Sequence, residues 1–259
     1  MSNKPVMIDL CCGLGGWAEG GLAEGYHAIG YDIEAHEYGD DKYPGELRLG
    51  DVLTLDGAQF ADAALIVASP PCQEYSYMAM PWKRGKQIAR ALRGDGDFPP
   101  GYKGSRTLAE LTAIFDACFR IQREASKAAG RYIPMVVENV RGAEPWVGQA
   151  KWSFGSYYLW GDVPALMPAT IKARKNPGFR FDGSGKSFQS ESVNRQRAEN
   201  HAGAGIKQGG SWFHDATSAS RTSSSKSPAR KAASAKIAKI PFALSSHIAR
   251  TYKPKRAAA

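Results

Sequence analysis

Short, uninterrupted apolar runs recur along the first two thirds of the chain. Strands that are covered on both faces need continuous apolar runs rather than alternating ones. The pattern therefore predicts a mostly parallel sheet, with strands at Val6–Cys11, His27–Tyr31, Ala64–Ala68 and Met135–Val137 and a further candidate at Tyr157–Trp160.

Helix-like segments lie between these runs. Trp17–Glu24 is one, and Thr107–Ala129 is the clearest, because Thr107 and Glu110 form a capping-box pattern ahead of apolar residues spaced three or four apart. Alternating strands and helices predict an α/β fold, Rossmann-like, with a doubly wound sheet.

Two stretches break this rhythm. Residues 78–106 combine glycines, a proline pair and seven basic residues, which predicts a long basic loop, and loops of that length are usually functional. Residues 162–231 are rich in Gly, Ser, Asn, Arg and Lys and lack apolar periodicity. We therefore expect three parts: an α/β domain over residues 1–161, a small irregular region over 162–231, and a C-terminal segment over 232–259.

The charge of the chain is uneven. The formal net charge is +9, and no acidic residue follows Asp215, although ten Lys and Arg residues do. A stretch of one sign suits a polyanionic partner, because each phosphate contact releases counterions; the alternative is a solvated tail.

The cysteines and apolar runs also exclude some classes of protein. No run approaches the roughly 20 apolar residues that span a bilayer, so we expect no membrane. The four cysteines contain no CxxC pair, which argues against a metal site. We interpret them as reduced thiols of a cytoplasmic protein.

Glycines follow the first strand and precede a helix, at Gly13, Gly15 and Gly16. Glycines at this position let the backbone approach a nucleotide-like ligand closely. Asp32 ends the next strand, where a carboxylate can accept hydrogen bonds from ribose hydroxyls, and Asp51 places a second acid for an adenine amino group. The spacing Gly13-x-Gly15-x-x-Ala18 also fits a dinucleotide pattern, so an NAD-dependent enzyme stays open at this point.

Two further segments end strands with reactive side chains. Ser69-Pro70-Pro71-Cys72-Gln73 places a thiol at the carboxyl end of a strand, where open α/β sheets bind ligands. This favours a nucleophile over a buried structural cysteine. Glu138-Asn139-Val140 ends another strand. Partial desolvation there should raise the pKa of Glu138, so that it holds a proton near neutral pH, although a solvated strand-end glutamate is the alternative.

These three segments, in this order, resemble the DNA (cytosine-5) methyltransferase family, and the short chain with Phe154–Gly161 is similar to compact members from bacteriophages. The resemblance implies S-adenosylmethionine as cofactor, duplex DNA as substrate and a Rossmann-like methyltransferase fold. It implies catalysis by Cys72 and Glu138 and substrate contacts at Gln73 and Asn139. The implied cofactor contacts are Cys11, Cys12, Gly13, Leu14, Gly15, Gly16, Asp32, Ile33, Asp51, Val52 and Pro71.

The resemblance also assigns roles to the remaining segments. Ile237–Leu244 resembles the family's final motif, which folds back beside the first strand and completes the cofactor pocket. The family's arginine element that holds the flipped cytosine is absent before Tyr157, and Lys151 and Arg174 are candidates to replace it. The irregular region then becomes a target-recognition region, and the basic loop would close over the DNA.

The implied reaction begins with addition of the Cys72 thiolate to C6 of a cytosine that has been flipped out of the duplex. The alternatives are an RNA (tRNA) cytosine-5 methyltransferase, an inactive DNA-binding module and the NAD-dependent enzyme. We expect the protein to act as a monomer.

Overall fold

The computed structural model describes residues 4–75, 82–167, 231–232, 235–236 and 238–254. Its centre is a seven-stranded sheet in the order β3-β2-β1-β4-β5-β7-β6. The first five strands of that order are parallel, and β7 runs antiparallel to both β5 and β6. The strands are β1 (Val6–Leu10), β2 (His27–Asp32), β3 (Glu46–Leu49), β4 (Ala63–Ala68), β5 (Met135–Asn139), β6 (Trp152–Phe154) and β7 (Tyr157–Gly161).

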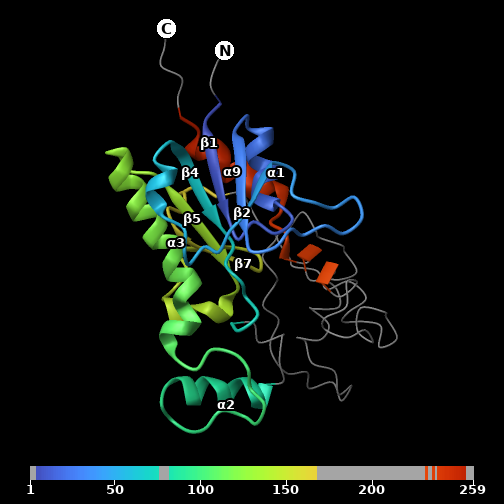
Figure 1. Ribbon diagram of the computed structural model, residues 1–259, viewed down its shortest axis with the longest axis vertical. Helices are drawn as coiled ribbons and strands as arrows, with labels where there is room; N and C mark the ends of the chain where they lie inside the picture. The colour runs from blue at the N-terminus through green and yellow to red at the C-terminus, as the bar shows by residue number, and fades with distance from the viewer. Residues whose placement is uncertain (1–3, 76–81, 168–230, 233–234, 237, 255–259) are drawn as a thin grey trace, which may run out of the picture.

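Helices cover both faces of this sheet (Figure 1). Met7 and Leu65 pack in the cluster on the side of α1 and α9, whereas Ile8 and Ile66 pack in the cluster that includes α3. Burial on both faces explains the continuous apolar strands, and the predicted doubly wound α/β fold is confirmed. The helices are α1 (Gly16–Ala23), α2 (Trp82–Leu92), α3 (Leu108–Ala129), α4 (Glu144–Val147) and α9 (Phe242–Tyr252), with 3-10 turns η1 (Gly57–Phe60) and η2 (Arg141–Ala143).

The start of α3 confirms the predicted cap. The Thr107 side chain accepts a hydrogen bond from the Glu110 backbone N–H. The Glu110 carboxylate accepts from the backbone of Arg106, one residue earlier than in a standard capping box. Gly130, with φ of 62°, ends the helix.

The apolar pattern does not reveal β3 and β6. β3 is a four-residue edge strand with Glu46, Arg48 and Leu49 exposed, so it has no apolar run to recognise. β6 is three residues long and forms a hairpin with β7. Both strands are defined by backbone pairing with a neighbour.

The expectation of an irregular basic loop over residues 78–106 is wrong for residues 82–92, which form α2. Ile88, Ala91 and Leu92 make one buried face, whereas Lys83 and Lys86 are exposed. This apolar face is short, and the surrounding charges hide it in the sequence. In Figure 1, α2 stands apart from the layers, at the end of the molecule opposite the N-terminus.

The C-terminal segment returns to the N-terminal part of the chain. Ile240 and Leu244, which belong to the segment expected beside the first strand, pack in the same buried cluster as Met7 of β1. α9 packs along α1, and Figure 1 shows the two helices side by side. The Tyr26 hydroxyl donates to the Ala249 carbonyl at 3.0 Å. α1 can pack this closely against the C-terminal segment because Gly16 and Gly20 have no side chain. A Cβ at Gly16 would overlap the Ile240 backbone, and a Cβ at Gly20 would overlap the backbone at Ser246.

Four cations of the basic stretch after Asp215 are paired with carboxylates near the N-terminus. The pairs are Lys231–Glu34 at 3.4 Å, Lys236–Asp41 at 2.6 Å, Lys239–Glu19 at 2.6 Å and Arg250–Glu24 at 2.7 Å. These side chains help attach the C-terminal segment to the N-terminal part of the chain, and the expectation of a polyanionic partner stays a prediction.

Two further findings concern the described part of the chain. None of its helices combines the length and apolar character that crossing a bilayer requires. All four cysteines are free thiols, and the described residues contain no grouping of three or more side chains suited to a metal ion.

Candidate active site at the carboxyl edge of the sheet

The carboxyl ends of the central parallel strands bring the predicted motifs together. Leu10 pairs with both Tyr31 and Ala68, and Ala68 pairs with Val137. The glycine loop, Asp32, the Cys72 turn and Glu138 therefore lie at the carboxyl ends of four adjacent strands, and neighbouring strands lie about 4.8 Å apart.

The glycine loop is open on one side. The backbone N–H of Gly13 donates to the Asp32 carboxylate at 2.9 Å, and the same carboxylate accepts from the Ile33 N–H at 2.8 Å. Gly13 has a φ of 49°, and a Cβ there would meet nothing within 4 Å. A ligand can therefore reach the loop backbone next to Asp32.

Most of the other loop residues are buried. The side chains of Cys12 and Leu14 are buried. Cys11 has a φ of 53°, a conformation that residues with a side chain rarely adopt and that tends to occur at functional sites.

The predicted adenosine contacts after β2 and β3 differ in their exposure to solvent. Ile33 is 75% exposed and Asp51 is exposed, but the Val52 side chain lies in the core. Arg120 of α3 holds this connection by donating to the Val52 carbonyl at 3.2 Å. Leu53, 46% exposed, is an open neighbour that the sequence did not single out.

The Cys72 turn is anchored at both ends. The Ser69 N–H donates to the Leu10 carbonyl at 3.1 Å, and the Tyr75 N–H donates to the Cys72 carbonyl at 3.1 Å. The Tyr75 hydroxyl donates to the Leu111 carbonyl on α3 at 2.7 Å. These bonds fix a half-buried thiol at the sheet edge.

Glu138 and Asn139 lie on the strand beside that turn. Glu138 is 3% exposed, which confirms the expected burial, while the pKa rise stays a prediction. Burial raises the pKa of Tyr157, and the charge of Glu138 adds to the rise. The buried Asn139 amide donates to the Pro70 carbonyl at 3.0 Å, so Asn139 holds the nucleophile turn; its contact with substrate stays a prediction.

The other three cysteines are poor nucleophiles. Burial raises the pKa of the Cys11 and Cys12 thiols well above the usual range, and it raises that of Cys118 to about 12. Such thiols stay protonated near neutral pH. Cys72 is therefore the candidate nucleophile.

Some site residues were not predicted. The Trp17 indole N–H donates to the Ser69 hydroxyl at 3.0 Å and joins α1 to the nucleophile turn. Glu74 accepts from the Ser105 N–H at 2.9 Å and from the Tyr102 hydroxyl at 3.2 Å. Trp17 could have been noticed because it is the aromatic residue directly after the loop glycines. No local sequence signal links Glu74 to Tyr102 and Ser105, which lie 28 and 31 residues away in the chain.

Arg93 makes a cation–π contact with Trp146, which lies in the segment after Glu138. The guanidinium of Arg93, just after α2, lies 4.4 Å from the centre of the Trp146 ring in α4. The segment after the nucleophile and the segment after Glu138 are thus linked.

The remaining predicted cofactor and substrate residues are less defined. Gln73 and Pro71 are exposed beside Cys72. The exposed Lys151 donates its backbone N–H to the Leu159 carbonyl at 2.8 Å, and Leu159 pairs with Glu138. Arg174 lies outside the described residues, as does most of the predicted target-recognition region.

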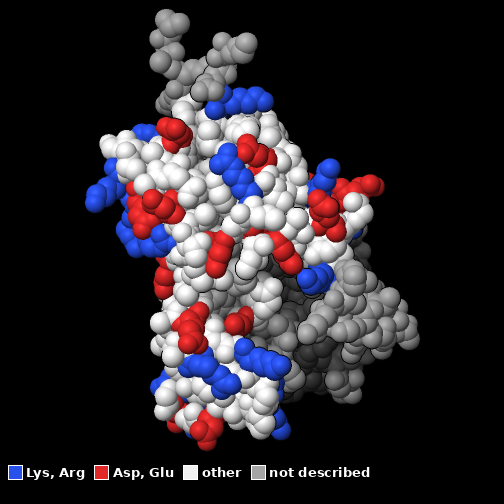
Figure 2. Space-filling model, in the orientation of Figure 1, with Lys and Arg blue, Asp and Glu red and all other residues white. Residues whose placement is uncertain are grey.

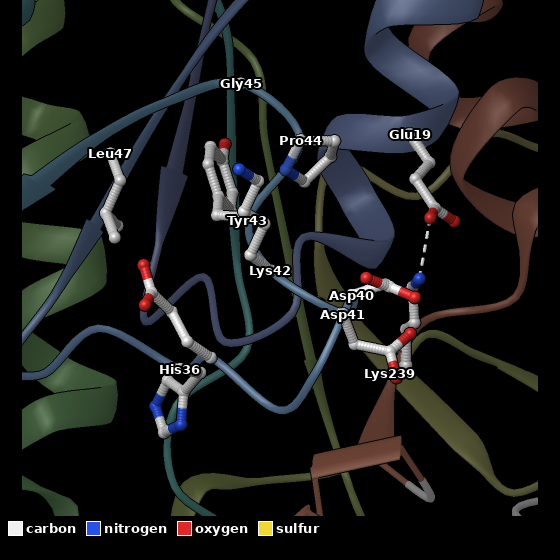
Figure 3. Close-up of a pocket in the computed structure, with 11 residues that line it drawn as sticks. Glu19, His36, Asp40, Asp41, Lys42, Tyr43, Pro44, Gly45, Leu47 and Lys239 are labelled. Atoms are coloured by element: carbon white, nitrogen blue, oxygen red, sulfur yellow. Dashed lines mark hydrogen bonds and ion pairs between the residues drawn. The ribbon is translucent and has the colours of Figure 1, made fainter.

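A hollow of about 570 Å³ lies beside the glycine loop (Figure 3). Its lining includes Glu19, Glu37, Asp40 and Asp41, and Lys239 bridges to Glu19. This acidic lining does not suit a phosphate. The hollow adjoins Tyr43 and Pro44, which separate it from the loop glycines.

The family model described as C-5 cytosine-specific DNA methylase matches residues 6–90. None of the curated proteins matches the chain.

Several solved structures are similar, each at 16% identity. For the Dnmt2 methyltransferase of S. pombe, the match covers 54% of this chain and 35% of that one, with a TM-score of 0.31. The match to the Entamoeba histolytica methyltransferase EhMeth covers 56% of this chain and 41% of that one, with a TM-score of 0.33. The match to a Spodoptera frugiperda DNMT2 mutant covers 56% of this chain and 38% of that one, with a TM-score of 0.32. The chain thus spans less than half the length of these proteins. Through residues 6–90, which include the glycine loop and Cys72, the chain is similar to the C-5 cytosine-specific DNA methylase family.

Proposed function

We propose that the protein transfers a methyl group from S-adenosylmethionine to carbon 5 of cytosine in duplex DNA, with Cys72 as a covalent nucleophile. The observation that carries the proposal is the direct tie between the two reactive segments. Asn139, adjacent to Glu138, holds the Pro70 carbonyl two residues before Cys72. A thiol and a buried carboxyl group are thereby presented from adjacent strands.

The residues at the edge fit the cofactor. The open backbone at Gly13, the Asp32 carboxylate and the exposed Ile33 side chain would hold the adenosine part. S-adenosylmethionine supplies an electrophilic methyl group when bound. The buried face of the glycine loop is closed by Tyr43, Pro44 and Ile240, so a ligand would approach from the Gly13 side.

The side chains supply the remaining chemistry. Sγ of Cys72 would bond to C6 of the cytosine, breaking the C5=C6 double bond and moving an electron pair to C5. Glu138 would hydrogen-bond ring N3 and stabilise the charge that the addition creates. After C5 gains the methyl group, water would remove the C5 proton, and Cys72 would leave as thiolate to restore the double bond.

A base in a stacked duplex cannot reach Cys72, so the reaction needs base flipping. The exposed Lys83 and Lys86 of α2 support a contact with the phosphate backbone beside the site. Figure 2 shows Lys and Arg side chains over the α2 end of the molecule, with acidic side chains close by, so this face is mixed rather than uniformly basic. Arg90, for example, pairs with Asp95 at 3.0 Å.

The rival functions explain less of the site. An NAD-dependent enzyme has no use for the Pro-Pro-Cys turn, and an inactive DNA-binding module has none for Cys72 and Glu138 together. The family description favours DNA over RNA as the substrate.

The test is transfer of a tritiated methyl group from S-adenosylmethionine to duplex DNA of varied sequence and, separately, to tRNA. We expect transfer to DNA by the wild type, none by Cys72→Ala, and near wild-type transfer by the matched control Cys118→Ala. Transfer to tRNA alone would assign the RNA alternative. Full activity of Cys72→Ala would overturn the mechanism. DNA that contains 5-fluorocytosine should trap a covalent adduct with the wild type but not with Cys72→Ala, because fluorine cannot leave as a proton does.

A further inference from the structure

Tyr43 fills a cradle made by glycines of three separate elements: Gly15 of the glycine loop, Gly30 of β2 and Gly45 before β3. A Cβ at Gly15 would lie 2.8 Å from Cδ2 of the ring, and one at Gly45 would lie 3.0 Å from Cε1. A Cβ at Gly30 would overlap Cζ. The ring therefore sits where only glycine leaves room for it.

The cradle lies under the point where the glycine loop becomes α1. Gly15, with φ of 71°, is the N-cap of that helix, and its N–H donates to the Cys12 carbonyl at 2.8 Å. Pro44 packs against the same glycine. The loop is thus supported by Tyr43 and Pro44 on the protein side, while Gly13 stays open on the other.

The Tyr43 ring lies near a buried carboxyl group, that of Asp9. Tyr43 is 6% exposed and Asp9 is fully buried. In the described part of the chain, neither Asp9 oxygen nor the Tyr43 hydroxyl has a hydrogen-bonding partner of good geometry. Burial raises the pKa of Tyr43, and the charge of Asp9 adds to the rise. In Figure 3 the Tyr43 hydroxyl points away from Asp40 and Asp41.

Removing the ring would therefore leave a void between the glycine loop, β2 and a buried carboxyl group. Pro44 would remain in contact with Gly15. The loop backbone would then relax toward the void, and small shifts in a ligand-binding backbone cost large factors in affinity.

We propose that Tyr43 is a positioning residue for S-adenosylmethionine, whose ring holds the Gly13–Gly16 backbone in the shape that receives the cofactor. The inference rests on the proposed function for the identity of the cofactor. It adds a residue in the β2–β3 connection, outside the three motifs, that sets cofactor affinity.

The test is calorimetric titration of the full chain with S-adenosylmethionine and with S-adenosylhomocysteine. We expect Tyr43→Ala to raise the dissociation constants by about 10-fold or more and Tyr43→Phe, which keeps the ring, to stay within about 3-fold. Phe119→Ala is the matched control, because it removes a partly buried ring from α3, away from the glycine loop. It should lower the thermal midpoint while leaving both dissociation constants within about 3-fold.

A second readout separates positioning from general damage. Tyr43→Ala should bind duplex DNA within about 2-fold of wild type in fluorescence anisotropy, since the cradle is away from α2. If Tyr43→Ala does not fold, Tyr43→Leu, measured below its thermal midpoint, takes its place. Wild-type affinity in the folded Tyr43 variant, or an equal loss in Phe119→Ala, would overturn the proposal. A wild type that binds neither ligand would instead refute the proposed cofactor, and the Tyr43 proposal with it.

Discussion

The side-chain amide of Asn139 donates a 3.0 Å hydrogen bond to the backbone carbonyl of Pro70. Asn139 follows Glu138 on β5, and Pro70 precedes Cys72 by two residues after β4. The amide oxygen Oδ1 of Asn139 is also used, since it accepts from the Val140 N–H at 2.8 Å. One buried side chain thus fixes the relative position of the proposed nucleophile and its acid.

Replacing Asn139 with leucine should slow methyl transfer more than it harms the fold. The change leaves the Pro70 carbonyl and the Val140 N–H without their partner, which costs about 1–3 kcal/mol of unfolding free energy. We expect kcat to fall at least about 10-fold with cofactor affinity unchanged, because only the Cys72 turn moves. Gln122→Leu is the matched control, since it removes another buried amide that bonds a backbone carbonyl, that of Ile133 at 2.8 Å. Equal losses of kcat in both variants would contradict a specific role for Asn139.

Replacing Trp17 with phenylalanine should loosen the contact between α1 and the nucleophile turn. The indole N–H that donates to the Ser69 hydroxyl at 3.0 Å is lost, while most of the buried ring is kept. We expect a stability loss of about 1 kcal/mol, typical for one hydrogen bond. A double-mutant cycle with Ser69→Ala, followed by chemical denaturation, should show a coupling energy of similar size. Additive effects of the two changes would argue against the bond.

Replacing Glu74 with alanine should free the segment that follows α2. Its carboxylate accepts from the Ser105 N–H and the Tyr102 hydroxyl, and no other described bond ties these two residues to the turn. Because Glu74 is exposed, the global stability should change by less than about 1 kcal/mol. Hydrogen exchange of residues 98–106 should become faster, while exchange in α3 should stay the same. The exchange rate of residues 98–106 in Glu74→Gln, which keeps an acceptor oxygen, should lie between those of the wild type and Glu74→Ala. Unchanged exchange in Glu74→Ala would rule out this tether.

The buried Asp9 should make stability fall as the pH rises. Burial raises the pKa of this carboxyl group well above its usual range, and the nearby Asp32 charge adds to the rise. Between the unfolded pKa near 4 and the raised folded pKa, the native state binds more protons than the unfolded chain. The free energy of unfolding should therefore fall with rising pH in this window, by at most about 1.4 kcal/mol per pH unit for one proton.

Asp9→Asn carries no titrating proton and tests that assignment. The unfolding free energy of Asp9→Asn minus that of the wild type should increase from pH 5 to pH 8 in urea titrations. Parallel curves for the two proteins would mean that Asp9 has no raised pKa in the native state.

The local sequence was sufficient to locate the main strands and the chemistry at their ends. β1, β4 and β5 were visible because burial on both faces demands continuous apolar runs, and the Thr107 cap was visible because its partner lies three residues away. Since parallel strands end at one edge, the same reasoning brought Cys72 and Glu138 to a common site.

Only the tertiary structure decided which side chains support that site. Tyr43 beneath Gly15, Glu74 against Ser105 and Asn139 on Pro70 all act on partners that are distant in the chain. α2 was hidden because its apolar face is short, and α9 lies on α1 because Gly16 and Gly20 allow close packing. Periodicity and turn chemistry report what a residue does to its near neighbours, whereas these contacts exist only after the strands and helices have assembled.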